Sequence, residues 1–330
     1  MITQDLYEQV LVQPAREHGD ALNIVSGYAS AAFAADHLQD MLTMPSRPVV
    51  HLIVGMFPQI GFLRSNHLAF QQLSTTDYPI GFECRYVVAP PPVHVKAYSW
   101  YRSGQPLRGF VGSANYSKKG FASQQCEAVT LSNAQEVQNY FDNLWGAALD
   151  CREAEADRLV AEAVAAYQAK PPQADITGDT TEAEISVLPH VRLTLLAENG
   201  DIHKGGGGLN WGQRPGREPN QAYIPIPAAI GRSGLFPPLK QHFTLMTDDG
   251  KSLICVPAEP KQKGGTVPHA IHTPLNNSDM GLYFRYRLGV PSGAFVTKAD
   301  LDNYGRTDVI IYKLDAETYY MDFSVGKAGE

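Results

Sequence analysis

Hydrophobic and polar positions alternate with different periods in the two halves of the chain. In the first half, short apolar runs typical of buried strands separate segments whose apolar residues recur every three or four positions, as they do in helices. The predicted strands span residues 22–29, 49–57, 82–89, 93–101, 109–112 and 128–131. The predicted helices span residues 31–42, 62–73, 133–148 (with Asn133 as the N-cap) and 154–169. This order favours an α/β sandwich with a mixed sheet over residues 1–169.

The pattern changes after residue 169. Residues 170–185 are polar, acidic and poor in large apolar side chains, which predicts a linker. Residues 186–330 then hold short strands punctuated by glycine and proline, and only two short helices, at 278–288 and 298–304. The predicted strands span residues 191–196, 222–226, 243–246, 253–256, 309–314 and 319–323. Many short strands at this spacing predict a small all-β barrel.

Composition describes a globular chain and leaves the kind of partner open. The 330 residues suffice for two domains, with 44 % hydrophobic and 18 % charged residues. The four scattered cysteines form no CxxC pair, so we expect a reduced, cytoplasmic chain without a structural zinc site. The apolar runs are too short to cross a bilayer, and no secretory signal is evident, so no membrane partner is expected.

Net charge does not decide whether the protein binds nucleic acid. The overall charge of −7 is concentrated in residues 150–185, which hold 3 basic and 9 acidic residues. Residues 1–149 hold 9 basic and 11 acidic residues, and residues 186–330 hold 15 and 14. The two predicted domains are therefore nearly neutral, and either can present a local basic face.

One group of residues in the first half suits attack on a phosphodiester. His94 and Lys96 are predicted to share one face of a strand, Ser113 and Asn115 follow the next strand, and Glu127 comes twelve residues later. An imidazole can attack phosphorus while a lysine and an amide hold the other phosphate oxygens, and a carboxylate can orient the imidazole. A lone His-x-Lys is typical of an exposed strand, but the full set in this order favours catalysis.

This set resembles the active-site signature of the phospholipase D superfamily, particularly its nuclease branch. The resemblance implies that His94 is the nucleophile, that Lys96 and Asn115 bind the scissile phosphate with support from Ser113, and that Glu127 hydrogen-bonds the histidine. The chain departs from the signature at Tyr101, where the superfamily has an aspartate. Because the signature occurs once and the chemistry needs two histidines, the resemblance implies a homodimer with one composite site, and no metal or cofactor.

The second half carries two polar segments that we interpret as DNA-contacting arms. The first is glycine-rich but lacks the Lys-Ser or Lys-Thr pair of a P-loop. Arginine, asparagine and glutamine are the side chains that read base edges through two hydrogen bonds. The candidate DNA-binding residues are Lys204, Asn210, Trp211, Gln213, Arg214, Arg217, Asn220, Gln221 and Tyr223 in the first arm and Lys261, Lys263, Asn276, Asn277 and Ser278 in the second. Each segment taken alone is equally typical of an ordinary surface loop.

Residues 217–227, 236–237, 249–250, 276–287 and 300–309 resemble the B3-like DNA-recognition domain of restriction endonucleases. A phospholipase D-type nuclease followed by such a domain is similar to the NgoFVII/NgoAVII type of restriction enzyme. The resemblance implies a Type II enzyme that cleaves double-stranded DNA at a short specific site and dimerises through its nuclease domain. It also allows for a separately encoded ATPase subunit and a cognate DNA methyltransferase.

Several alternatives stay open at this point. Asp249-Gly250-Lys251 imitates part of the metal-dependent PD-(D/E)xK site, although a hairpin turn explains it. A lipid phosphodiesterase, a non-specific phosphodiesterase and a DNA-binding protein without restriction function are further readings. A last hypothesis makes the acidic linker a DNA mimic that silences the nuclease through Asp175, Asp179, Glu182 and Glu184, although the sequence favours a solvated spacer.

Overall fold

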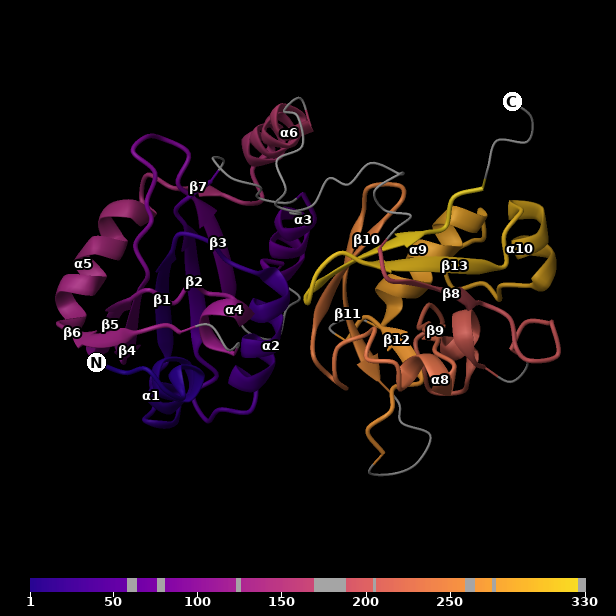
Figure 1. Cartoon of the computed structure of the whole chain (residues 1–330), viewed down its shortest axis with the longest axis horizontal. Coiled ribbons are helices and arrows are strands. Elements are labelled where there is room, and N and C mark those ends of the chain that lie inside the picture. Colours follow the sequence, from indigo (N-terminus) through magenta and orange to yellow (C-terminus); the bar gives the residue numbers. More distant parts are fainter. Residues whose placement is uncertain are drawn as a thin grey trace. The chain divides into compact units, whose positions relative to one another are not determined.

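The chain forms two compact units, Met1–Asp179 and Thr180–Glu330, each with its own seven-stranded sheet (Figure 1). The structure is a computed structural model that describes residues 1–57, 64–75, 81–122, 126–168, 188–203, 206–258, 265–274 and 277–325. The predicted linker at 170–185 lies outside these residues. Within them, no helix is both long and apolar enough to span a membrane.

The first unit is built on a mixed sheet, as predicted. Its strands are β1 (Ala21–Ser26), β2 (Val49–Val54), β3 (Phe82–Tyr86), β4 (Ala97–Arg102), β5 (Gln105–Gly112), β6 (Val129–Ser132) and β7 (Leu149–Asp150), in the order β6-β5-β4-β1-β2-β3-β7. Strands β1, β2 and β3 are parallel, and the other neighbours are antiparallel. The central strands are buried on both faces, which explains why the sequence there reads as continuous apolar runs. The short strand β7 had no sequence signal.

Helices cover both faces of this sheet. They are the π-helix η1 (Tyr7–Val12), α1 (Gln13–Arg16), α2 (Ala31–Met41), α3 (Arg64–Leu73), α4 (Lys118–Phe121), α5 (Ala134–Trp145) and α6 (Ala154–Gln168). Figure 1 shows α5 on one side of the sheet and α2 and α3 on the other. Side chains begin two of these helices: Ser30 accepts the Phe33 N–H at the start of α2, and Asn133 accepts the first N–H groups of α5. The predicted α/β sandwich is confirmed.

The second unit is a nearly closed barrel. Its strands are β8 (His190–Thr194), β9 (Ile224–Pro225), β10 (Phe243–Thr247), β11 (Ser252–Ala258), β12 (Ala270–His272), β13 (Asp308–Lys313) and β14 (Thr318–Asp322), in the order β8-β13-β14-β10-β11-β12-β9. Only β10 and β14 pair in parallel. The two end strands, β8 and β9, contact each other, which brings the ends of the sheet together. The barrel encloses a core that includes Phe243, Tyr319 and Phe323.

Helical content in this unit is higher than expected. The predicted helices α9 (Ser278–Leu288) and α10 (Lys298–Tyr304) are present, but so are the 3-10 helix η2 (Gly208–Gln213) and the short α8 (Ala228–Gly231). The prediction of only two helices is therefore wrong. The glycine-rich segment becomes helical because the Asn210 side chain exchanges hydrogen bonds with both backbone groups of Val296, which fixes it in the core.

Candidate active site

The predicted catalytic residues come together at one edge of the first sheet. Strand β4 pairs antiparallel with β1 and with β5, and β6 pairs antiparallel with β5. Strands β1 and β5 therefore end at this edge of the sheet, and β4 and β6 begin there. The register places Val25 opposite Ala97, Ala97 opposite Val111, and Gly112 opposite Val129. Residues that flank these positions therefore meet, although they come from segments far apart in the sequence.

His94 and Lys96 lie just before β4, not within it. The predicted strand at 93–101 begins only at Ala97, because the Val93 N–H pairs with the Gly55 carbonyl at 2.9 Å instead of with a neighbouring strand. The two side chains differ in environment, and the prediction that both residues lie within a strand is wrong. His94 is exposed, whereas Lys96 is buried and donates its Nζ to the His94 carbonyl oxygen at 2.8 Å.

Burial of Lys96 changes its acidity. Loss of solvent lowers the pKa of its ammonium group, and the nearby carboxylate of Glu127 partly offsets that effect. Lys96 and Glu127 therefore interact electrostatically at this edge. A partly desolvated cation is a strong partner for a phosphate oxygen, because little water competes for it.

Ser113 and Glu127 form a linked pair between β5 and β6. The Ser113 N–H donates to the Ala128 carbonyl at 2.9 Å, and the Ala128 N–H donates to Ser113 Oγ at 3.1 Å. The Ser113 hydroxyl in turn donates to the Glu127 carboxylate. These bonds fix the carboxylate that interacts electrostatically with Lys96. The expectation that Glu127 hydrogen-bonds His94 stays a prediction.

Asn115 is oriented by the end of β1. Its Oδ1 accepts the Tyr28 N–H at 3.0 Å and lies 3.4 Å from the Ser26 hydroxyl. A backbone N–H can only donate, so the amide oxygen must face Tyr28, and the amide nitrogen is turned to the other side. Asn115 therefore presents a hydrogen-bond donor, which is what a phosphate oxygen requires.

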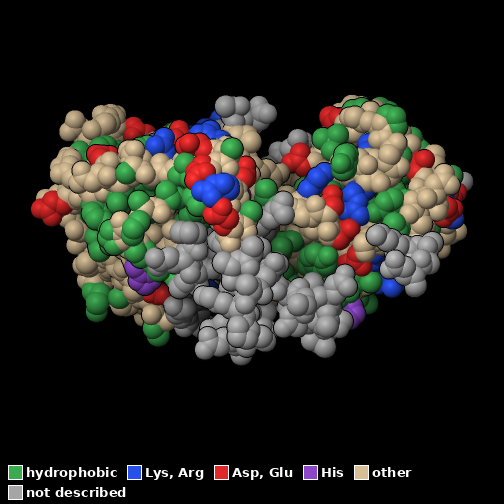
Figure 2. Space-filling view, turned by 90° about the horizontal axis from the view of Figure 1, so that it is seen from above, with side chains coloured by type: hydrophobic (Ala, Val, Ile, Leu, Met, Phe, Trp, Pro, Cys, Tyr) green, Lys and Arg blue, Asp and Glu red, His purple; other side chains and the backbone are tan. Residues whose placement is uncertain are grey.

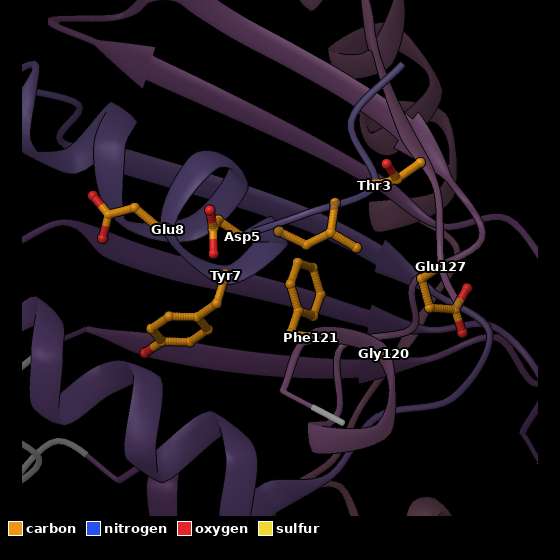
Figure 3. A pocket seen from close by; sticks show the side chains of 8 residues that line it. Thr3, Asp5, Tyr7, Glu8, Gly120, Phe121 and Glu127 are labelled. Carbon is orange, nitrogen blue, oxygen red and sulfur yellow. The ribbon is translucent and has the colours of Figure 1, made fainter. Parts of the chain in front are cut away.

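A hollow of about 310 Å³ opens beside Glu127. Figure 3 shows Glu127 at one end of this hollow and Tyr7 and Glu8 at the other. The lining comprises Thr3, Asp5, Leu6, Tyr7, Glu8, Gly120, Phe121 and Glu127. It includes three carboxylates and no lysine or arginine, so it does not suit a phosphate.

The candidate DNA-reading residues divide by burial. Asn210, Asn220 and Ser278 are buried, and their polar groups bond within the unit: Asn210 to Val296, and both Asn220 and Ser278 to Glu218. Their side chains support the fold of the arms. Lys204, Lys261, Lys263 and Asn276 lie outside the described residues.

Trp211 brings the remaining candidates together. Its ring is almost fully buried, with the Arg217 guanidinium 4.2 Å above it and the Tyr223 ring edge-on at 5.8 Å. Arg217 is exposed and also donates to Gln221 at 3.1 Å. The other exposed or half-buried candidates are Gln213, Arg214 and Asn277. Figure 2 shows acidic and basic side chains interspersed on the face that it displays.

Sequence reasoning missed the residues on which the site is assembled. Ser26 ends β1, Gly27 and Tyr28 follow it, and together the three residues contact His94 and Asn115. Their only sequence signal is a small residue and a glycine directly after a buried strand, a pattern too common to single out.

Each half of the chain matches a known protein family. Residues 4–158 match the family model of the NgoFVII restriction endonuclease N-terminal PLD domain, where PLD stands for phospholipase D. Residues 183–315 match that of the NgoFVII C-terminal B3-like DNA-binding domain. The fold is thus that of a phospholipase D-type nuclease domain joined to a B3-like domain. By both halves, the chain belongs to the NgoFVII restriction endonuclease family.

Three solved structures each resemble part of the chain. Nuc, a phospholipase D family member from Salmonella typhimurium, is 14 % identical with a TM-score of 0.33, covering 43 % of this chain and 89 % of its own. NucT from Helicobacter pylori is 11 % identical with a TM-score of 0.30, covering 42 % and 87 %. Polyphosphate kinase from Porphyromonas gingivalis is 9 % identical with a TM-score of 0.30, covering 48 % of this chain and 26 % of its own. No curated protein matched the chain.

Proposed function

We propose that this protein is a sequence-specific DNA endonuclease of restriction that hydrolyses a phosphodiester bond through a covalent phosphohistidine on His94. The observation that carries the proposal is the meeting of an exposed imidazole, a buried cation and an oriented amide donor at one sheet edge. The match of the remaining chain to a DNA-binding domain family supports DNA as the substrate.

In the first step, a ring nitrogen of His94 forms a bond to phosphorus while the bond to the leaving oxygen breaks. Lys96 and the Asn115 amide nitrogen stabilise the charge that builds on the other phosphate oxygens. The leaving oxygen needs a proton, which we assign to His94 of the partner subunit. In the second step, that imidazole takes a proton from water, the water oxygen bonds to phosphorus, and the N–P bond breaks.

This scheme makes the active unit a homodimer with one composite site and needs no metal ion. Sequence specificity is assigned to the second unit, through Arg214, Arg217, Gln221, Tyr223 and Asn277. Gln213 supports this arm through its bonds to the Pro219 and Gly293 carbonyls. The arm residues Lys204, Lys261, Lys263 and Asn276 stay predictions, as do an ATPase subunit, a methyltransferase and a cytoplasmic location. We retain the division into a nuclease domain (1–169), a linker (170–185) and a DNA-binding domain (186–330).

The decisive experiment is plasmid cleavage in excess EDTA by the purified protein and by its His94→Ala variant. We expect defined fragments from the wild type and none from the variant. Cutting that requires added magnesium would reject the phosphohistidine mechanism. Cutting by His94→Ala at the wild-type rate would remove His94 from the reaction. Fragments without defined ends would leave a nuclease but reject sequence specificity.

A further inference from the structure

The loop Ser26-Gly27-Tyr28 lies between the two halves of the candidate active site. Ser26 is the last residue of β1, and Gly27 and Tyr28 follow it, whereas His94 precedes β4 and Asn115 follows β5. The loop is itself fixed, because the Gly55 N–H donates to the Ser26 carbonyl at 2.8 Å and the Met56 N–H to the Gly27 carbonyl at 3.0 Å. It is therefore a rigid base against which both functional side chains can be placed.

Ser26 ties this loop to the segment that carries Asn115. Its side chain is fully buried, accepts the Tyr116 N–H at 2.9 Å and donates to the Tyr28 carbonyl at 2.5 Å. The same hydroxyl lies 3.4 Å from Asn115 Oδ1. The Ser26 hydroxyl thus links the main chain of Tyr116, the residue after Asn115, to the main chain of Tyr28. The Tyr28 N–H in turn binds the Asn115 side-chain amide.

Gly27 is the point of closest approach to His94. A Cβ at this position would lie 2.8 Å from His94 Cδ2 and 3.4 Å from Asn115 Oδ1. The backbone of Gly27 does not adopt a left-handed conformation, so glycine is required here for space, not for its φ angle. The imidazole therefore packs directly on the loop backbone.

Tyr28 contacts both functional residues at once. Its N–H holds the Asn115 amide at 3.0 Å, and its ring meets the His94 ring edge-on, with centroids 5.8 Å apart and an interplanar angle of 77°. An edge-on aromatic contact restricts how the imidazole can rotate. Tyr28 thus fixes the direction of one group through its main chain and of the other through its side chain.

We propose that Ser26, Gly27 and Tyr28 are positioning residues that set the nucleophile His94 and the phosphate-binding amide of Asn115 in mutual register. The proposal rests on the proposed function for the roles of those two residues. Because the loop residues act through their neighbours, disturbing them is expected to slow the chemical step while DNA binding by the second unit persists.

The test compares Gly27→Ala with Gly146→Ala, the matched control. An added Cβ at Gly146 meets no atom within 4 Å, so this change makes the same substitution in open space in the same unit. We expect Gly27→Ala to lower kcat by roughly 100-fold with DNA affinity within about twofold of wild type, since misplacement of about 1 Å has effects of this size. Gly146→Ala should behave as wild type. Equal kcat for the two variants would overturn the proposal.

A second pair keeps the test decisive where Gly27→Ala fails to fold. Tyr28→Phe keeps the ring and the main-chain N–H, whereas Tyr28→Ala keeps only the N–H. We expect near-wild-type kcat for Tyr28→Phe, and for Tyr28→Ala a loss of at least about tenfold in kcat with little change in KM. Equal rates for both variants would show that the Tyr28 ring does not position His94.

A spectroscopic reading separates this proposal from the proposed function. With isotope-labelled histidine, the His94 imidazole signals are identified by their absence from the His94→Ala spectrum. Gly27→Ala and Tyr28→Ala should both shift these signals, because both alter the surroundings of the ring, and Gly146→Ala should not. Unmoved signals would reject the positioning role even in an active enzyme. Shifted signals in a protein that cuts no DNA would support the positioning role and reject only the nuclease assignment.

Discussion

Lys96 is a lysine whose position makes its charge sensitive to pH. Burial lowers the pKa of its ammonium group, and Glu127 partly offsets that shift. In its proposed role the ammonium stabilises phosphate charge only below this pKa, so activity should fall on the alkaline side before the value of about 10.4 that is usual for lysine. We expect this decline in a plot of log(kcat/KM) against pH, which reports groups of the free enzyme.

Two substitutions test the assignment of that alkaline decline. Lys96→Arg should move it out of the accessible range, because a guanidinium keeps its proton, although at a lower maximal rate. Glu127→Gln should move the decline to lower pH, because it removes the carboxylate that raises the pKa of Lys96. A decline that stays in place in Lys96→Arg would assign it to another group.

Asn115 offers a test of a single hydrogen-bond donor. Asn115→Asp keeps an oxygen to accept the Tyr28 N–H but replaces the outward-facing amide nitrogen by a second oxygen. We expect the variant to fold normally and to lose at least about 100-fold in kcat, the usual effect of removing one preorganised donor from a charged transition state. Thermal unfolding tests whether the variant folds normally, and single-turnover cleavage measures the loss of rate. Retained cleavage would exclude Asn115 from phosphate binding.

Residue identity and order were enough to predict which side chains meet, but not how each is held. The sequence places His94, Lys96, Ser113, Asn115 and Glu127 near the ends of neighbouring strands, and the structure brings them to one edge. It does not indicate that Lys96 is buried while His94 is exposed, or that the amide oxygen of Asn115 is used internally. Those features depend on backbone contacts between segments far apart in the chain.

At the scale of elements, α2 is joined to η1 and to the Asn115 segment by a buried histidine. His37 in α2 contacts the Tyr116 hydroxyl through Nδ1 at 2.7 Å and the Leu11 carbonyl through Nε2 at 3.4 Å. Since the carbonyl can only accept, Nε2 carries the proton and Nδ1 accepts from the tyrosine. A neutral imidazole therefore connects three elements.

Burial lowers the pKa of His37 to about 4, from an ordinary value of 6.5. The unfolded chain then binds a proton near pH 6.5 that the folded chain binds only near pH 4. His37 therefore makes the free energy of unfolding fall as pH decreases through this window, by about 3 kcal/mol in full. Urea unfolding at several pH values between 7.5 and 4 measures this loss.

The comparison for that measurement is His37→Gln. The variant is less stable near neutral pH but should lose less stability on acidification, because the titrating group is gone. Burial also lowers the pKa of His51, so the free energy of unfolding of both proteins falls somewhat as the pH decreases. The prediction concerns the difference between wild type and variant in how steeply this free energy falls. Parallel stability curves for the two proteins would contradict it.

Element boundaries were hard to predict wherever tertiary hydrogen bonds decide them. Apolar and polar residues alternate through 93–96 as in a strand, yet the Val93 N–H pairs with Gly55 and the strand begins at Ala97. The glycine-rich segment from Lys204 to Arg214 is typical of a surface loop, yet η2 (Gly208–Gln213) forms within it because Asn210 is fixed to Val296. In contrast, α5 was predicted well, because its Asn133 cap and apolar spacing are local.

At the scale of the whole molecule, the proposed chemistry and the proposed DNA reading belong to different units. The exposed Arg217, stacked on Trp211 and bonded to Gln221, is the clearest candidate for reading a base edge. Arg217→Ala should weaken binding to DNA that contains the recognition site by about 1–3 kcal/mol. Hydrolysis of a small phosphodiester such as bis(p-nitrophenyl) phosphate should stay unchanged. Arg192→Ala, at another exposed arginine of the same unit, serves as control. Equal binding by both variants would exclude Arg217 from recognition.

Subunit stoichiometry is the last property that the proposed mechanism fixes. If one composite site needs His94 from both subunits, a dimer that contains a single His94→Ala subunit is inactive. Wild-type and variant chains, mixed in equal amounts and allowed to exchange subunits, should then retain about a quarter of the activity of the same total amount of wild type, because only pairs of wild-type chains are active. Independent sites would instead retain about half, the fraction of intact subunits. Sedimentation of the mixture verifies that the chains are dimeric, and single-turnover cleavage distinguishes the two values. A result of one half would leave His94 as nucleophile but require the leaving oxygen to take its proton from a group in the same subunit.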